Sequence, residues 1–217
     1  RQNIYRKNEK SEEVKIRLRQ WKGYDKMAQN REKERCGRMG HFYYVRHGQT
    51  VWNVENKICG ATDIPLTPLG YEQARELGEE ILRQGLKIDK ILYSPLIRAK
   101  ETARQISEAA GIPMEEEIRL KEQNFGMYES TPRDGAEFRK AKENFVSSYN
   151  GGESMLKLCQ RIYNLLDDLR ERSDTETVLL VAHNGIARAV HSYFYDMTNE
   201  EFAAFGMKNC QIRRYDF

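Results

Sequence analysis

Two histidines of this chain each follow a short apolar run. His47 comes after "FYYV" (42–45) and Arg46, and His183 comes directly after "TVLLVA" (177–182). Apolar runs of this length predict buried strands. Ligands of open α/β sheets bind in the crevice outside the carboxyl ends of the strands. If the two strands are neighbours, both imidazole rings enter one crevice, so we predict that His47 and His183 belong to one site.

The other two histidines carry a plainer interpretation. The chain has only four, and His41 and His191 do not stand at the end of an apolar run. We interpret them as ordinary surface or hydrogen-bonded core positions.

A cation stands where a predicted helix begins. Residues 94–95 (Ser-Pro) have the pattern of a helix start, which places Arg98 in the first turn. A positive charge there opposes the helix dipole, unless an anion is held by the helix end and the guanidinium together. Arg46, Arg98 and the backbone amides around Gly48 and Gly185 would form an anion-selective pocket, and phosphate is the natural ligand.

Glu122 is the candidate proton donor. It ends the weakly strand-like segment "EEIRLKE" (116–122). A single glutamate is usually a solvated surface residue. If it enters the crevice, the site holds a nucleophile, phosphate-binding cations and an acid, which suffice for phosphoryl transfer without a metal. No acidic cluster stands beside a glycine-rich phosphate loop, so we expect neither a metal nor a cofactor.

The elements that position these residues alternate along the chain. Strands are predicted over 42–45, 87–93, 116–122, 177–182 and 210–216, and helices from Thr67-Pro68 onward and over 94–111, 155–169, 185–195 and 199–205. The first helix should bury Leu69, Leu77, Ile81 and Leu82. This alternation predicts an α/β fold, a three-layer α/β/α sandwich with a mostly parallel central sheet.

Composition excludes several classes of protein. The 217 residues are 39% hydrophobic and 32% charged, as in soluble globular proteins. No apolar stretch approaches the roughly 18 residues of a membrane span, and no signal-peptide pattern is present. The four cysteines lie far apart without a C-x-x-C pair, which favours a reducing, cytoplasmic location over a disulfide or zinc framework.

Residues 1–40 form a basic N-terminal extension with 13 Lys or Arg against 6 Asp or Glu. We favour a solvated extension. Two other interpretations stay open: an arm that contacts nucleic acid or an anionic membrane, and a segment outside the native domain, which would then start at Met39. Residues 41–217 are the predicted catalytic domain.

Six segments in family order resemble the histidine phosphatase superfamily, in the branch related to cofactor-dependent phosphoglycerate mutases. They are "RHGQTVWN" (46–53), "GATDIPLTPLGYEQA" (60–74), "SPLIRAKETA" (94–103), "EQNFGMYE" (122–129), "GGES" (151–154) and "VAHNG" (181–185). The three-residue segment Arg-His-Gly alone would be weak support, whereas six matches in order are strong.

The resemblance implies a covalent mechanism. His47 would attack phosphorus and become a phosphohistidine, and Glu122 would protonate the leaving alcohol and later activate water. Arg46, Arg98 and His183 would hold the phosphoryl oxygens. Further phosphate or substrate contacts would come from Asn53, Gly48, Thr62 and Asn184.

The resemblance leaves two reactions open. A mutase keeps its phosphohistidine dry, and the family's glycolytic mutases cover the site with a long insertion between the acid and the Gly-Glu-Ser element. Here Glu122 and Gly152 are only 30 positions apart, which leaves room for a short helical lid around 134–147. We therefore predict hydrolysis of a small phosphorylated molecule, with mutase activity as the alternative.

Other functions and assemblies are less favoured. A non-catalytic phosphate-binding module would not need His47, Glu122 and His183 together. Nucleic acid binding rests on the basic extension alone. A homodimer stays open.

Overall fold

A five-stranded sheet forms the centre of the computed structural model, which describes residues 40–217. The predictions about the basic extension concern residues outside this range. The strands are β1 (His41–Arg46), β2 (Lys90–Tyr93), β3 (Met114–Glu116), β4 (Val178–Ala182) and β5 (Ile212–Asp216). Their order is β3-β2-β4-β1-β5, and only β5 is antiparallel to its neighbour. The predicted mostly parallel sheet is confirmed.

The two strands that precede the histidines are neighbours at the centre of the sheet. β1 and β4 pair in parallel, with Arg46 opposite Ala182. All five residues of β4 are buried, as expected for a strand covered on both faces. Because the two strands end at the same level, His47 and His183 leave the sheet side by side.

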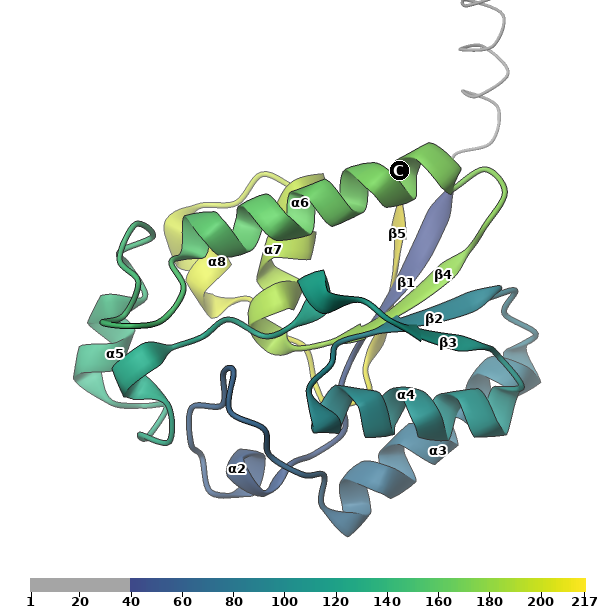
Figure 1. Cartoon of the computed structure of the whole chain (residues 1–217), viewed down its shortest axis with the longest axis horizontal. Helices are drawn as coiled ribbons and strands as arrows, with labels where there is room; N and C mark the ends of the chain where they lie inside the picture. Colours follow the sequence, from purple (N-terminus) through teal and green to yellow (C-terminus); the bar gives the residue numbers. More distant parts are fainter. Residues whose placement is uncertain (1–39) are drawn as a thin grey trace, which may run out of the picture. The chain divides into compact units, whose positions relative to one another are not determined.

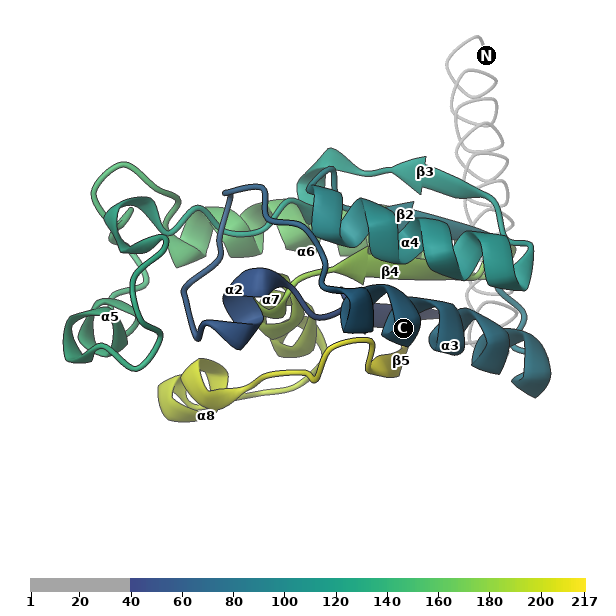
Figure 2. The ribbon, with the colours of Figure 1, turned by 90° about the horizontal axis from the view of Figure 1, so that it is seen from below.

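Helices cover both faces of the sheet, which confirms the three-layer architecture (Figure 1). On one face lie α3 (Pro68–Gln84) and α4 (Ile97–Ala110), and on the other lie α6 (Met155–Arg172) and α7 (Asn184–Phe194). Figure 2 shows these layers from below. The short helices are α2 (Val51–Val54), α5 (Ala136–Ala141) and α8 (Asn199–Ala204), with 3-10 turns η1 (Ile118–Leu120) and η2 (Gly126–Tyr128).

Alternation along the central strands divides the core in two. Tyr44 and Leu180 point into the cluster under α6 and α7, while Val45 and Val181 point into the cluster under α3 and α4. Successive residues of a strand face opposite sides of the sheet, so each strand supplies both clusters. The apolar side chains of α6 recur at helical spacing and are buried as predicted.

Three local predictions were wrong. Segment 116–122 is not a strand, because β3 ends at Glu116 and η1 follows. Ser94 does not cap α4. The N-cap is Leu96, without a side-chain hydrogen bond, and the Ser94 hydroxyl instead contacts His183 and the N–H of Leu96.

The third error concerns the first long helix. Leu69 and Leu82 of α3 are exposed, and the small residues Gly70, Ala74 and Gly78 take the buried face with Leu77 and Ile81. Small side chains let α3 approach its neighbours closely. A Cβ on Gly78 would stand 2.7 Å from Ala109 of α4. Thr67 does cap α3, and proline starts it, as predicted.

Within residues 40–217 no helix is long and apolar enough to cross a membrane.

Candidate active site

The two histidine rings meet at the carboxyl end of the central strands. Their centroids lie 5.2 Å apart, and the backbone N–H of His47 donates to the carbonyl of Ala182 at 2.9 Å. His47 is 4% exposed and His183 is wholly buried. The predicted association of the two rings is therefore present.

The surroundings of His47 fix its tautomer. Nδ1 lies 2.7 Å from the carbonyl oxygen of Gly48, and a carbonyl can only accept, so Nδ1 carries the proton. Burial and the charges of Arg98 and Arg46 lower the pKa of His47 well below its usual range. The ring is therefore neutral near pH 7 and holds a lone pair on Nε2, the state that a nucleophilic imidazole needs.

His183 has the opposite tautomer. Its Nδ1 accepts from Nε of Arg98 at 3.2 Å, so Nε2 carries the proton and donates to the Ser94 hydroxyl at 2.7 Å. Its main chain is held by Tyr44, whose hydroxyl donates to the His183 carbonyl at 2.6 Å and accepts from the His183 N–H at 3.1 Å. Burial, followed by the charge of Arg98, lowers the pKa of His183 well below its usual range.

Arg98 is the largest wholly buried side chain among the described residues. Its two terminal nitrogens donate to the carbonyls of Thr62 and Gly60 at 2.8 and 2.7 Å. That loop is held by Glu129, whose carboxylate accepts from the amides of Ala61 and Thr62, both at 2.8 Å. A continuous set of contacts therefore runs from Glu129 through Arg98 to His183.

Arg46 supplies a cation on the wall of the pocket. One terminal nitrogen donates to the carbonyl of Met207 at 2.5 Å, and Nε is buried without a partner. Burial and the charge of Arg133 lower its pKa to about 10. Beside it, the Asn53 side-chain oxygen accepts from the N–H of Thr50 and from Asn209, both at 3.1 Å, so the amide is fixed in orientation.

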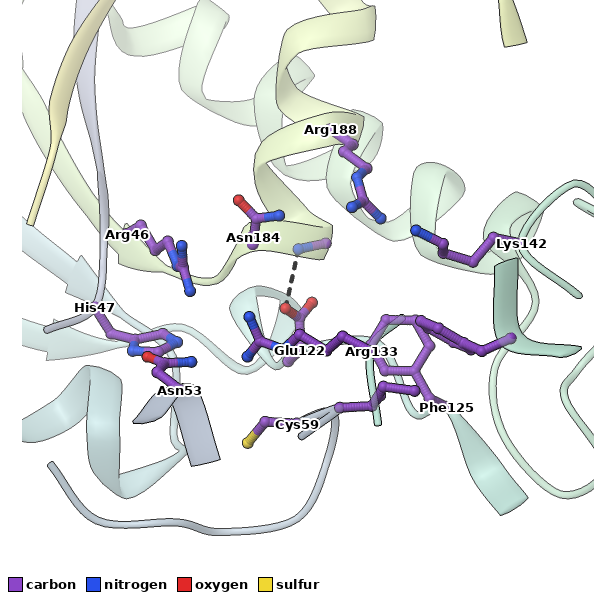
Figure 3. Close-up of a pocket in the computed structure, with 13 residues that line it drawn as sticks. Arg46, His47, Asn53, Cys59, Glu122, Phe125, Arg133, Lys142, Asn184 and Arg188 are labelled. Carbon is purple, nitrogen blue, oxygen red and sulfur yellow. Dashed lines mark hydrogen bonds between the residues drawn. The ribbon is translucent and has the colours of Figure 1, made fainter. Parts of the chain in front are cut away.

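Glu122 enters the crevice and lines the same pocket as His47 (Figure 3). Its carboxylate accepts from the N–H of Gly185 at 3.0 Å and from the N–H of Gln123 at 2.9 Å. The side chain is 5% exposed. The two amides fix the position of this buried carboxyl group, as a group that transfers protons requires.

A pocket of about 130 Å³ brings together five of the nine predicted site residues. These are Arg46, His47, Asn53, Glu122 and Asn184. The other four, Arg98, His183, Gly48 and Thr62, do not line it.

Those four residues already have protein partners. The Gly48 amide donates to the Thr102 hydroxyl at 3.0 Å, and the Thr62 amide and hydroxyl bind Glu129. Arg98 and His183 are wholly buried and bonded to each other. Their phosphoryl contacts therefore stay predictions.

Three further cations line the pocket and were not predicted: Arg133, Lys142 and Arg188. Arg188 lies one helical turn after Asn184 on α7, so the helical spacing of the predicted segment 185–195 could have indicated it. Arg133 and Lys142 lie on the segment around α5, where no periodicity or strand end marks them. Within residues 40–217, no group of three His, Cys, Asp or Glu side chains is placed to hold a metal ion.

Comparisons with known proteins agree with this geometry. Residues 42–217 match the family model described as histidine phosphatase superfamily (branch 1). The "Probable phosphoglycerate mutase GpmB" of Yersinia pestis (strain Pestoides F) is 32% identical over 182 residues, which cover 81% of this chain and 84% of the relative.

Among solved structures, a mycobacterial glucosyl-3-phosphoglycerate phosphatase is similar with a TM-score of 0.71 and 26% identity, over 82% of this chain and 90% of that one. A protein named mycobacterial hydrolase 1 has the same TM-score and identity, over 82% and 91% of the two chains. The family match and these neighbours support a phosphoric monoester hydrolase. The chain belongs to the histidine phosphatase superfamily.

Proposed function

We propose that this protein is a phosphatase that hydrolyses a small phosphomonoester through a phosphohistidine on His47, without a metal or cofactor. Residues 41–217 form its catalytic domain, and we propose a cytoplasmic location. One observation carries the proposal: a neutral His47 with a free Nε2 lines the same pocket as the cation Arg46 and the carboxyl group of Glu122.

In the first step, Nε2 of His47 forms a bond to phosphorus while the bond from phosphorus to the ester oxygen breaks. Glu122 donates its proton to the leaving oxygen, which departs as an alcohol. Arg46 and Asn53 line the pocket next to His47 and hold the phosphoryl oxygens as negative charge develops. The Gly48 carbonyl accepts from Nδ1 and so stabilises the positive charge that the ring acquires.

In the second step, water attacks phosphorus and gives a proton to the carboxylate of Glu122. The bond between phosphorus and Nε2 breaks, inorganic phosphate leaves, and His47 and Glu122 return to their starting states. Arg98 adds positive charge, the neutral His183 is held in orientation by Arg98 and Ser94, and both contact the phosphoryl group when it is bound.

The short segment beside the pocket supports hydrolysis over transfer. Between Glu122 and Gly152 the described chain has only one 3-10 turn and the six-residue helix α5. A cover that small leaves a path by which water reaches the phosphohistidine. Mutase activity is the second candidate, because one relative is named a probable phosphoglycerate mutase. It would appear as primer-stimulated exchange of phosphate between positions of phosphoglycerate.

The test is hydrolysis of p-nitrophenyl phosphate with and without a chelator. We expect steady phosphate release that the chelator does not reduce, and an acid-labile, base-stable phosphoenzyme after rapid quenching. His47→Ala should abolish both signals. His41→Ala, on the same strand but outside the pocket, is the matched control and should retain them. Full activity of His47→Ala, or loss of activity with the chelator, would contradict the mechanism.

A further inference from the structure

Part of the pocket wall carries positive charge that hydrolysis of a simple phosphomonoester does not require. Arg46 and His47 serve the phosphoryl group, but Lys142 and Arg188 also line the pocket. Figure 3 shows these two side chains apart from His47, with their nitrogen ends pointing toward each other. They come from different elements, α7 and the end of α5.

Arg188 is oriented by one contact that leaves most of its donors free. Its Nε–H donates to the carbonyl of Phe205 at 3.0 Å, and the two terminal nitrogens form no hydrogen bond with residues 40–217. Burial lowers the pKa of Arg188, because removing the guanidinium from water disfavours its charged form. A guanidinium fixed through Nε presents its terminal N–H groups as a fork that suits a carboxylate or a phosphate.

Lys142 is the second cation, and it has no acidic partner. Its Nζ lies 5.3 Å from the centre of the Phe138 ring, and among the described residues it forms no ion pair. Burial and the nearby charges of Arg188 and Arg139 lower its pKa to about 8. Two cations that face each other repel, and an anion between them would remove this repulsion.

Among the described residues, Glu122 is the only acidic residue that lines the pocket. Its charge raises the pKa of Arg188, but its carboxylate already accepts from the amides of Gly185 and Gln123. In the proposed mechanism Glu122 also carries the transferred proton, so it cannot serve as a permanent counter-ion for Arg188 and Lys142.

We propose that Arg188 and Lys142 form a second anion subsite, which binds a carboxylate or a second phosphate on the leaving part of the substrate. This inference rests on the proposed function, since it places the scissile phosphoryl group at His47. The preferred substrates are then phosphomonoesters with a second negative group. Because Lys142 follows α5, binding of that group also fixes the α5 segment over the pocket.

The test measures binding with phosphonates, which cannot be hydrolysed. Titration calorimetry at pH 7.0 compares alkylphosphonates with ω-carboxyalkylphosphonates and α,ω-bisphosphonates of two to five methylenes. The carboxylate and bisphosphonate arms distinguish the two kinds of second anion. We expect at least one second-anion series to bind about 10- to 100-fold more tightly than the matched alkylphosphonate, as charge-assisted hydrogen bonds provide.

The variants locate the effect. In Arg188→Gln and in Lys142→Met the ratio of dissociation constants should fall below about threefold. Lys140→Met, an exposed lysine of α5 outside the pocket, is the matched control and should keep the full ratio. No advantage at any chain length, or an advantage that survives both substitutions, would overturn the subsite. A binding advantage without phosphohistidine or phosphate release would instead refute the proposed phosphatase and leave the subsite standing.

Discussion

Tyr44→Phe removes one oxygen atom and should weaken both the fold and the site. The Tyr44 hydroxyl is wholly buried and makes two hydrogen bonds to the main chain of His183. The His183 carbonyl keeps a second donor, the N–H of Ala187 at 3.0 Å. The His183 N–H has no other partner among the described residues, so the substitution leaves it buried and unsatisfied.

The expected cost follows from these two bonds. An unsatisfied buried donor costs about 1–3 kcal/mol, and the loss of the carbonyl's second bond adds little because one donor remains. We expect the free energy of unfolding to fall by about 2 kcal/mol. For a domain of this size the melting temperature should fall by about 4–8 °C. Since His183 lies against His47, kcat should fall by about tenfold.

Urea denaturation, thermal melting and steady-state hydrolysis of p-nitrophenyl phosphate measure these effects. Tyr43→Phe is the matched control. Tyr43 is the preceding residue of β1 but faces the other core cluster, so its loss of stability should stay below about 0.5 kcal/mol. The reasoning fails if Tyr44→Phe costs less than about 0.5 kcal/mol, or if the two variants lose the same stability.

Three further predictions concern the site. First, folding lowers the pKa values of His47 and His183. Below pH 6.5 both imidazoles are therefore protonated in the unfolded chain and still neutral in the folded chain. The free energy of unfolding should therefore fall by up to about 2.7 kcal/mol per pH unit below pH 6.5, and urea denaturation at stepped pH would contradict this with a flat profile. Second, Glu129→Ala should lower kcat of aryl phosphate hydrolysis about tenfold by freeing the loop at 60–62, whereas Glu129→Gln should recover part of the rate. Third, Gly48→Ala places a Cβ 2.4 Å from the carbonyl oxygen of Gly70. The free energy of unfolding measured by urea denaturation should therefore fall by about 1–3 kcal/mol. An unchanged denaturation midpoint would refute the close approach.

The sequence predicted the layers of the fold because hydrophobic periodicity is a local signal. The uninterrupted run in β4 and the helical spacing in α6 each follow from which faces must be buried. The same logic was wrong for α3, where close packing against α4 selected glycine and alanine over Leu69 and Leu82. It was also wrong for 116–122, where a short 3-10 turn gives no periodic pattern.

For the site, the sequence identified the residues at the ends of β1 and β4, because parallel strands place their carboxyl ends at one edge of the sheet. Only the tertiary structure decided which of them face the pocket. Arg98 and His183 are buried outside the pocket lining, while Arg188 and Lys142 come into the pocket from separate elements. Burial, tautomers and the facing of like charges depend on contacts between segments far apart in the chain, and no local pattern records them.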